Sequence, residues 1–523
     1  MINKKNIQIF FLFILFIFGC YCALTIGKSW DTFHFINAGK DRLRYLLSLG
    51  FLENKEQINP AIYPAIYNTL SAFILQLFPR KFELEVFHLI NFSVSFLAAF
   101  GVYKVTKELF GKEIASYSFV IFILFPIFFG HMAINDRDTI VTFCNIWATY
   151  YTFRYLKFKK NKNKKYIFYL GALIALGTGV RFAFISTLLP LAIFVSYKIY
   201  KEFNKKIFYQ IFLDLLKIVT ISYFLIVLFW TPTHENIFLK PYELIIASLK
   251  FAFGYPFTLL NGQIIQSNNV GGLYVIINQF FKVPEYVILL YVLFILFYFN
   301  IKNQFKNKSN FNFKVLFVLC NIFYPNLLLL INPFAIYDGI RFFMFGLPYL
   351  AILPAVTIHF LINNYKKNLY KFILSLLIIL KVYFLYTFIL LTPYHYTYLN
   401  KFVGDFSKAH NKFENDYWGT SLKELSNKIK SNEDLMLGKE TKILICGVGK
   451  GSTKYYLNKL NNFSYQIVGE RENPEFVILT NRILPYYNPK KSELKTCFDK
   501  HNGKILEKVT RNGLTLSAIK AFN

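Results

Sequence analysis

The sequence predicts an α-helical polytopic membrane protein that ends in a small α/β domain. Three observations lead to this fold class. Of the 523 residues, 55% are hydrophobic and 20% are aromatic, a composition that soluble globular domains do not have. Many apolar stretches approach the ~20 residues that an α-helix needs to span a bilayer. From residue 394 onward, the apolar residues instead come in short patches between polar ones.

The charge of the chain fits a membrane protein as well. It has 59 Lys and Arg residues against 29 Asp and Glu residues, a formal net charge of +30. In a soluble protein this excess would indicate nucleic-acid binding. Here the basic residues cluster in short loops between apolar stretches, as the positive-inside rule describes for cytoplasmic loops. We therefore expect the lipid bilayer, and no nucleic acid, as a partner.

About eleven transmembrane helices satisfy that rule, with the N-terminus in the cytoplasm and the C-terminus outside. The first is expected to be an uncleaved helix, because no small-residue cleavage site follows it. The predicted spans are Ile7–Gly27, Leu84–Tyr103, Ile114–Ala133, Thr139–Tyr155, Tyr166–Val180, Phe182–Tyr197, Ile207–Trp230, Pro284–Asn300, Val315–Ile331, Phe342–Ile362 and Phe372–Leu391.

Residues 1–393 thus form a membrane domain, in which residues 28–83 are predicted to be a large first external loop. The run Ala61–Phe78 within this loop is apolar, but a span there would move the acidic loop at Asp136 to the cytoplasm. Prolines within the run and on both sides of it favour a helix along the membrane interface.

Residues 394–523 are predicted to form a small extracytoplasmic α/β domain. Gly447–Gly451 lacks the spacing of a dinucleotide site, so we expect an ordinary turn there. Of the six cysteines, only Cys446 and Cys497 could pair outside the membrane, and their spacing leaves that pairing open. The expected elements are a helix over Ser421–Lys430, strands over Lys442–Cys446 and Phe476–Leu479, and a hairpin of Gly503–Val509 with Gly513–Ile519.

Three acidic residues lie near membrane boundaries, and the predicted topology places all three on the outer side. Asp31 follows the first span, and Asp136 and Asp138 flank Arg137 between two later spans. A carboxylate near hydrocarbon costs about 2.5–3.5 kcal/mol, so a membrane protein seldom keeps one there without use. The pattern predicts a catalytic site at the outer membrane surface.

Two solitary arginines, Arg181 and Arg341, lie at outer membrane edges, where the positive-inside rule disfavours them. Arginine suits bidentate phosphate binding, and contact with lipid headgroups is the alternative. The Gly- and Asn-rich loop Gly254–Val283 could stack a sugar, cover a site or merely connect two elements. The tyrosines of Tyr394–Tyr398 are expected to form an interfacial aromatic belt.

Several of these motifs together resemble the GT-C glycosyltransferases, particularly the protein O-mannosyltransferase branch and its bacterial relatives. Asp31-Thr32-Phe33-His34-Phe35 looks like the Asp-Glu-x-His-Phe motif of that branch, with Thr32 in place of Glu. Asn135–Ile140 resembles the second-loop motif, which closes with an aspartate. Ile340–Tyr349 is similar to a late Arg-Tyr…Pro segment, and Pro393–Asn400 with Asp416–Gly419 to a stretch common in the bacterial members.

The resemblance covers nearly the whole membrane domain and implies a GT-C type fold. It also implies an enzyme that moves a sugar from a polyprenyl-phosphate donor to an acceptor hydroxyl, with inversion at the anomeric carbon. Asp31 is then the base, and His34 orients it or contacts the acceptor. The alternatives are a helix cap or an interfacial partner of Lys28 for Asp31, and a structural role for His34.

We expect Asp136, Arg137, Asp138, Arg181 and Arg341 to handle the donor phosphate, and the resemblance supports this role for Arg341 in particular. Positive groups held at the leaving phosphate would lower the barrier to transfer. Asp136 and Asp138 could bind a divalent cation, Mg²⁺ or Mn²⁺, or could orient a cationic clamp. Asp138 could also cap the helix that starts beside it.

Two other functions fit the composition. A lipid-sugar transporter or flippase would usually have repeated halves and mid-membrane polar residues, of which only Lys381 and Asp214 are candidates. A polysaccharide polymerase or ligase would be expected to use external arginines and a histidine. The Lys-, Asn-, Ile- and Phe-rich composition suggests an AT-rich bacterial genome, and therefore the bacterial inner membrane and an undecaprenyl carrier. The acceptor could be a protein, a lipid or a glycan.

Overall fold

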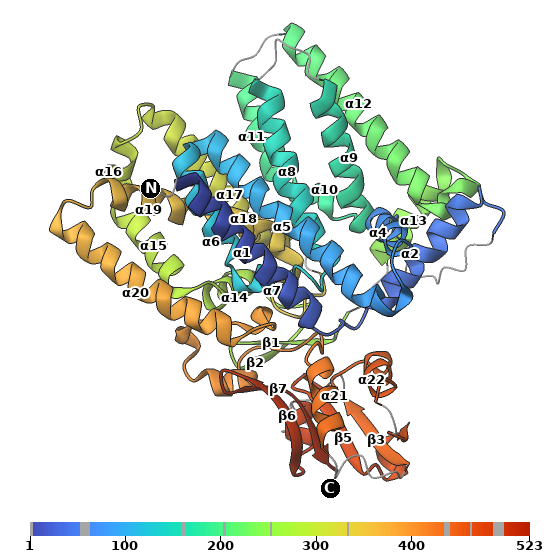
Figure 1. Cartoon of the computed structure of the whole chain (residues 1–523). Coiled ribbons are helices and arrows are strands. Elements are labelled where there is room, and N and C mark those ends of the chain that lie inside the picture. Colours follow the sequence, from blue (N-terminus) through green and yellow to red (C-terminus); the bar gives the residue numbers. More distant parts are fainter. Residues whose placement is uncertain are drawn as a thin grey trace.

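The computed structural model describes residues 4–52, 63–157, 164–201, 205–250, 254–331, 334–432, 440–460, 463–484 and 496–522. A helical bundle makes up most of the molecule, and a β-sheet from the C-terminal part lies at one end of it (Figure 1). Helix α1 runs through the bundle towards the sheet, and its end approaches the C-terminal part where Gly27 packs against Thr420.

The first part of the bundle contains both long and short helices. Its elements are α1 (Lys4–Thr25), α2 (Thr32–Leu47), α4 (Ile66–Leu75), α5 (Glu83–Phe110), α6 (Lys112–Ile123), α7 (Pro126–His131), α8 (Asp138–Lys157), α9 (Lys164–Val180), α10 (Phe184–Thr187), α11 (Leu189–Lys201), α12 (Lys205–Phe229) and α13 (Leu239–Lys250).

The second part starts with a small hairpin and continues with helices. Its elements are β1 (Phe257–Leu260), β2 (Gln263–Gln266), α14 (Tyr274–Lys282), α15 (Glu285–Leu296), α16 (Tyr298–Asn303), α17 (Lys308–Ile331), η3 (Arg341–Gly346), α18 (Leu347–Leu350), α19 (Ile352–Asn363) and α20 (Asn368–Leu390).

Within the described residues, five helical stretches are long and apolar enough to cross a membrane. The pair α14 and α15, bent by 113°, would make a sixth if it acts as one span. All five coincide with predicted spans, so the chain is a multi-pass membrane protein. The stretches are Arg80–Phe110, Phe208–Phe229, Lys308–Ile331, Arg341–Asn363 and Asn368–Leu390.

Other predicted spans are shorter or broken in the structure. The run Ile114–Ala133 divides into α6 and α7, because Phe125 has extended backbone immediately before Pro126. A proline ring disfavours helical geometry in the residue before it, so the helix ends there and a new one starts at Pro126. The run Phe182–Tyr197 is likewise divided between α10 and α11.

The apolar run in the first external loop forms no span, as predicted. Its helix α4 has 10 residues and is about 15 Å long, half the thickness of the bilayer core. Residues 61–62 of the predicted run lie outside the described residues. Helix α4 packs instead on α2 and α9, where Gly39 faces Asn68 and Gly179 faces Ile66.

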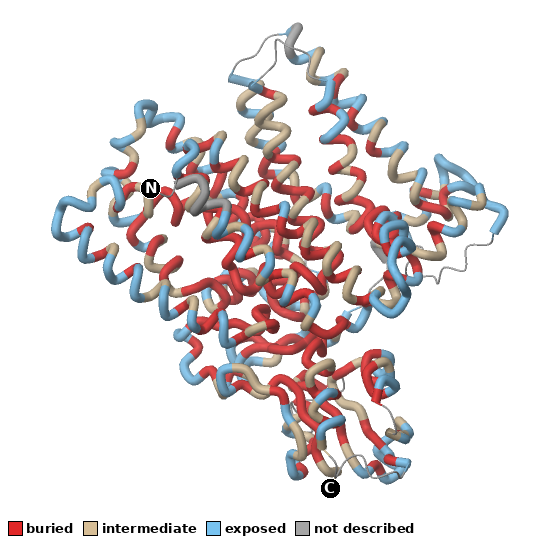
Figure 2. The backbone as a smooth tube through the Cα atoms, in the orientation of Figure 1, coloured by how far each residue is buried: buried red, intermediate tan, exposed pale blue. Residues whose placement is uncertain are grey.

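Exposed apolar side chains line the outer helices of the bundle, while the centre and the junction with the sheet are buried (Figure 2). Phe208, Leu215 and Phe224 project from α12, and Phe372 and Ile379 from α20, each with about half or more of its surface exposed. Apolar surface of this extent indicates contact with lipid.

The C-terminal part contains a mixed five-stranded sheet in the order β4-β3-β5-β7-β6. Strand β3 is parallel to β4 and β5, and β7 is antiparallel to β5 and β6. The predicted helix, both strands and the hairpin are confirmed. The elements are α21 (Leu422–Ser431), β3 (Thr441–Cys446), α22 (Lys450–Leu457), β4 (Tyr465–Ile467), β5 (Phe476–Thr480), α23 (Cys497–Lys500), β6 (Ile505–Arg511) and β7 (Leu514–Ala521).

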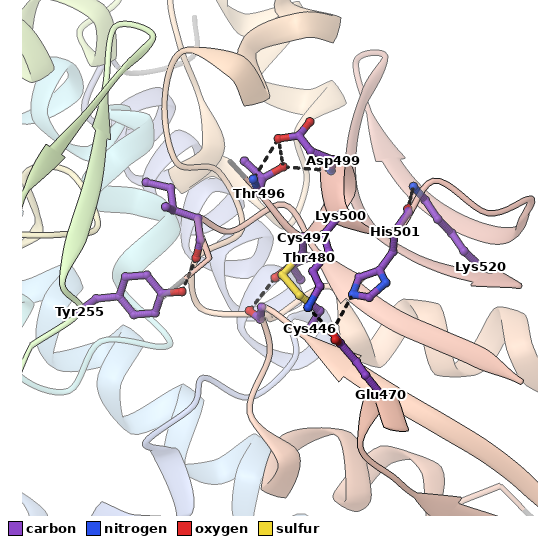
Figure 3. Close-up of a disulfide and its surroundings, with 12 residues drawn as sticks. Tyr255, Cys446, Glu470, Thr480, Thr496, Cys497, Asp499, Lys500, His501 and Lys520 are labelled. Atoms are coloured by element: carbon purple, nitrogen blue, oxygen red, sulfur yellow. Dashed lines mark hydrogen bonds and ion pairs between the residues drawn. A yellow bond between two sulfur atoms is a disulfide. The ribbon is translucent and has the colours of Figure 1, made fainter. Parts of the chain in front are cut away.

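A disulfide joins the two cysteines that could pair outside the membrane. Cys446 ends β3 and Cys497 begins α23, 51 residues later (Figure 3). The disulfide lies beside the start of the segment that follows β5, since the Cys497 backbone N–H donates a hydrogen bond to the Arg482 carbonyl at 3.0 Å.

The prediction of an aromatic belt at Tyr394–Tyr398 is wrong. Tyr394, Tyr396 and Tyr398 are buried at the junction of bundle and sheet. Tyr394 donates to Glu424 and Tyr398 to Glu285, each at 3.1 Å, and Tyr396 donates to Asp416. These hydroxyls find carboxylate partners in the protein and therefore have no need of lipid headgroups.

Candidate functional site

Asp31 lies at the N-terminal end of α2 and its side chain is exposed. The carboxylate makes no hydrogen bond with the free N–H groups of the helix, so the helix-cap alternative is wrong. Thr32 closes the turn instead. Its Oγ1 accepts from the Ser29 backbone N–H at 3.1 Å and lies 2.8 Å from Ser29 Oγ. The Asp31 carboxylate remains accessible to a ligand.

His34, in the first turn of α2, lies within electrostatic reach of Asp31. Burial lowers the pKa of His34, and the negative charge of Asp31 acts in the opposite direction. The charge of Asp31 also acts on Asp136 and Arg137 in the loop before α8. The fold therefore brings the first-loop and second-loop motifs together.

Asp136 is a buried carboxylate fixed by a residue of α4. Asn68 donates its Nδ2–H to Asp136 Oδ2 at 2.6 Å. Burial raises the pKa of Asp136, while the positive charge of Arg137 and the Asn68 hydrogen bond act to lower it. The helix from the external loop thus orients one side of the acidic motif.

Arg137 is held between aromatic rings. Its guanidinium carbon lies 3.8 Å from the centroid of Phe35 and 5.4 Å from that of Tyr63. Burial lowers the pKa of Arg137 and the like charge of Arg181 lowers it further, whereas Asp136 and Asp31 oppose the shift. Two arginines close enough to repel each other form a site of concentrated positive charge, which suits an anion.

Asp138 begins α8 but does not cap it, which corrects the capping alternative. Asn135 has that role, since its Oδ1 accepts from the backbone N–H groups of Arg137 and Asp138 at 3.2 and 2.9 Å. The Asp138 carboxylate accepts from Asn135 Nδ2 at 2.9 Å, and its Oδ1 lies 2.8 Å from Arg181 Nε. Asp138 therefore orients a cation.

The two predicted outer arginines lie against one ring. The guanidinium carbons of Arg181 and Arg341 are 5.0 and 4.4 Å from the centroid of Phe342. Arg341 is buried and its Nη2 lies 3.2 Å from Asp338 Oδ2. Each of these two arginines thus has a carboxylate partner, Asp138 for Arg181 and Asp338 for Arg341.

Asp338 also reaches the C-terminal part of the chain. Its Oδ1 accepts from Arg482 Nη2 at 3.0 Å, and Arg482 stacks on Trp30, 5.0 Å from the ring centroid. Trp30 immediately precedes Asp31. Arg482 therefore links the segment that carries the candidate base to the carboxylate that holds Arg341.

The predicted loop Gly254–Val283 contains the β1–β2 hairpin and helix α14. Residues 257–266 form the β1–β2 hairpin, and Tyr255 contacts the C-terminal part. Its hydroxyl donates to the Ile483 carbonyl, and its ring lies 4.1 Å from the Arg482 guanidinium carbon.

Several residues around the site were not found from the sequence, chiefly Asn68, Asp338, Arg482 and Glu414. Only Asp338 had a local signal, because it precedes Gly339 in a turn with positive φ and lies three residues before Arg341. The others contact the site through tertiary packing. Glu414 accepts from the Asp338 backbone N–H at 2.9 Å.

The contacts of Asp136 and Asp138 suit carboxylates that orient arginines better than carboxylates that bind a metal ion. Asp136 accepts from Asn68 and Asp138 pairs with Arg181, so both carboxylates already have donors. Among the described residues, no group of three or more His, Cys, Asp and Glu side chains could hold a metal ion. The arrangement provides an accessible carboxylate beside arginines, which suits proton abstraction next to a bound phosphate.

Comparison with known protein families gives one match. Residues 64–249 fit the model of the dolichyl-phosphate-mannose-protein mannosyltransferases. This segment includes Asn68, the acidic motif and Arg181. No curated protein sequence matches the chain significantly.

Solved structures with a similar fold include ArnT from Cupriavidus metallidurans, with a TM-score of 0.51, 9% identity, and coverage of 99% of this chain and 98% of that one. An oligosaccharyltransferase from Archaeoglobus fulgidus matches with a TM-score of 0.46 and 12% identity, over 91% of this chain and 70% of that one. The ArnT match extends over both the bundle and the C-terminal sheet.

Proposed function

We propose that this chain is a glycosyltransferase of the GT-C superfamily, related to the protein O-mannosyltransferases, and that it uses a polyprenyl-phosphate-sugar donor. It transfers the sugar to an acceptor hydroxyl at the extracytoplasmic surface, with inversion at the anomeric carbon. The family description, which names a dolichyl-phosphate-linked sugar, supports a lipid-linked donor.

The observation that carries this proposal is the uncapped, exposed carboxylate of Asp31 beside Arg137. Asp31 takes the proton of the acceptor hydroxyl as its oxygen forms a bond to the anomeric carbon. The bond between that carbon and the phosphate oxygen breaks, and the electron pair leaves with the polyprenyl phosphate. A well-placed base contributes about 10²–10⁴-fold to such a step.

The arginines stabilise the charge that develops on the leaving phosphate. Arg137 is within electrostatic reach of Asp31, and Arg181 and Arg341 lie along Phe342. Preorganised cations cost no reorganisation during the reaction, so they lower its barrier. In this mechanism Asp136 and Asp138 orient cations, and EDTA is expected to leave activity unchanged.

We also propose how many times the chain crosses the membrane and how it is oriented there. The chain crosses a bacterial inner membrane eleven times, with the N-terminus in the cytoplasm, and residues 394–523 form an extracytoplasmic domain. The basic clusters support this orientation, and the disulfide supports an oxidising compartment for the C-terminal part. Undecaprenyl phosphate is the proposed carrier, and the acceptor is a protein, a lipid or a glycan.

The test is hexose release from a radiolabelled polyprenyl-phosphate hexose in proteoliposomes, with and without EDTA. Asp31→Asn should lose turnover by at least about 10²-fold while it still binds the lipid. The matched control is Asp41→Asn, on the same helix, where Asp41 pairs with Arg44 at 2.5 Å. If both variants turn over normally, Asp31 is not the base. If the protein only moves the lipid across the bilayer, the transporter alternative replaces the enzyme.

A further inference from the structure

A cavity of about 730 Å³ opens at the end of the bundle opposite the C-terminal sheet. Four helices enclose it: the last turns of α5, α8 and α11 and the first turns of α17. It is far from the acidic motif, which lies at the other end of α8. None of the candidate catalytic residues lines it, so the transfer reaction leaves it unexplained.

Positive charge dominates the polar lining of this cavity. Lys157, Lys198, Lys201 and Lys314 line it, against the single carboxylate of Glu108. Glu108 is already paired, with Arg154 Nη1 at 3.1 Å and with Lys157 Nζ at 3.4 Å. Lys314 donates to the Leu109 carbonyl at the end of α5.

Lys198 and Lys201, in the last turn of α11, differ from these residues. Within the part of the chain that the structure describes, neither of them has a carboxylate partner. Among the described residues, the cavity therefore has two lysines without a carboxylate partner. An anion between them would be attracted by both positive charges.

The wall of the cavity is aromatic. Phe194 of α11 stacks on Phe313 of α17 with the ring centroids 4.5 Å apart, and Tyr197 lies 4.9 Å from Phe313. Phe153 of α8 lies 5.5 Å from Phe194. A free phosphate would gain nothing from these rings, whereas the glycerol and first methylenes of a lipid would bury apolar surface against them.

An apolar groove of about 510 Å³ continues from the cavity along the outside of α11. Tyr197 lines both the cavity and the groove, so the two meet at this side chain. Leu189 and Ile193 line the groove with 47% and 62% of their surfaces exposed, on the side of the helix that faces lipid. The groove runs from the basic end of the helix towards the middle of the bilayer, as a lipid chain does.

We propose that this cavity and groove bind one anionic glycerophospholipid, with its phosphate between Lys198 and Lys201 and one acyl chain along α11. Basic pockets between transmembrane helices at the cytoplasmic side are sites for anionic headgroups. The lipid fills the gap between α11 and α17 and fastens α11 to the bundle. The site does not depend on the proposed transfer reaction.

The test is native mass spectrometry of the full chain after delipidation, with phosphatidylglycerol or phosphatidylcholine of the same acyl chains added back. The wild type should retain phosphatidylglycerol in preference. The double variant Lys198→Gln/Lys201→Gln should bind phosphatidylglycerol roughly 10- to 30-fold more weakly. This loss corresponds to about 1 kcal/mol for each lysine near the phosphate. Inorganic phosphate at the same concentration should not displace the lipid.

The matched control is Lys366→Gln/Lys367→Gln, which removes two exposed charges from the turn between α19 and α20, outside the cavity. It should keep the preference of the wild type. Equal retention of the two lipids, or an equal loss in the control, would overturn the proposal. So would displacement by inorganic phosphate. Ile193→Asp, which places a charge in the groove, should weaken long-chain binding even if the double lysine variant proves unstable.

Discussion

Arg137 shows how a single residue is prepared for an anion. Its guanidinium carbon lies over the ring of Phe35 and near that of Tyr63, so rings from two different segments fix its position. Stacking leaves the edge of the guanidinium, where the N–H donors lie, available for bidentate contact with phosphate. A lysine could keep the charge but would lose both the stacking and the fork of donors.

Arg137→Ala should therefore lower the turnover of the lipid-linked donor by about 10²–10³-fold, the cost of removing one preorganised donor from a developing anion. Arg137→Lys should recover only part of this loss. Steady-state kinetics in proteoliposomes would separate kcat from KM. Arg44→Ala, which removes an exposed arginine from α2, is the control. Full activity of Arg137→Ala would exclude a role in phosphate stabilisation.

Glu414 gives the site a pH-dependent stability. Burial and the negative charge of Asp338 raise its pKa from 4.5 to about 7, against the positive charge of Arg482. The folded state thus binds the proton more tightly than the unfolded chain. This proton binding stabilises the folded state fully below pH ~4.5. The stabilisation is lost as the pH rises through about 7, and the free energy of unfolding then falls by up to about 1.4 kcal/mol per pH unit.

Glu414→Gln removes this titration while it keeps an oxygen for the Asp338 N–H. The variant should match the wild type near pH 5 and exceed its apparent Tm at pH 8. Thermal unfolding in detergent across this range measures the difference. A constant Tm difference between the two proteins from pH 5 to pH 8 would show that Glu414 does not titrate there.

At the scale of elements, the segment after β5 joins the sheet to the site. Arg482 follows β5 and contacts Asp338 and Trp30. Two constraints fix its backbone: the Cys497 N–H donates to the Arg482 carbonyl, and Tyr255 donates to the Ile483 carbonyl. The disulfide at the start of α23 therefore holds the segment that presents Arg482.

Cys446→Ser/Cys497→Ser should weaken both the C-terminal sheet and the site. Opening a loop of 51 residues costs about 4 kcal/mol in the chain-entropy model. The apparent Tm should fall, and transfer activity should fall with it because Arg482 loses its support. Arg482→Ala should reduce kcat with the disulfide intact, and Arg482→Lys should restore part of it. If the serine variant unfolds early but keeps its full kcat when folded, the disulfide has no influence on Arg482.

The helices and long-range contacts of the fold differ in how well the sequence predicts them. Helices α12 and α20 follow from length and hydropathy. Asp31 and Asp136, which the sequence predicts on one side of the membrane, are within electrostatic reach of each other. The break between α6 and α7 was missed because Pro126 interrupts a run that is apolar throughout. The pair Arg482–Asp338 joins residues 144 apart, and no local pattern encodes such a contact.

At the scale of the whole molecule, the sheet is part of the same body as the bundle. Lys423 of α21 donates to the Leu24 carbonyl of α1 at 2.7 Å, and Tyr456 of α22 accepts from the Lys28 N–H at 2.6 Å. Arg511 of β6 donates to the Thr392 carbonyl at 2.7 Å after α20. The sheet thus contacts the membrane domain at its first helix and again after its last helix, and these contacts fix the sheet over the candidate site.

This arrangement makes the orientation of the chain testable with one pair of residues. Asn458 is exposed in the C-terminal part and Lys366 is exposed in the turn before α20, at the opposite end of the bundle. In intact cells, a membrane-impermeant thiol reagent should label Asn458→Cys and spare Lys366→Cys, and after lysis it should label both. The free cysteines lie in apolar helices, where a charged reagent does not reach them. The reverse labelling would place the candidate site in the cytoplasm. The disulfide would then lie in a reducing compartment. A transferase on that side would also have to meet its donor before the donor is exported.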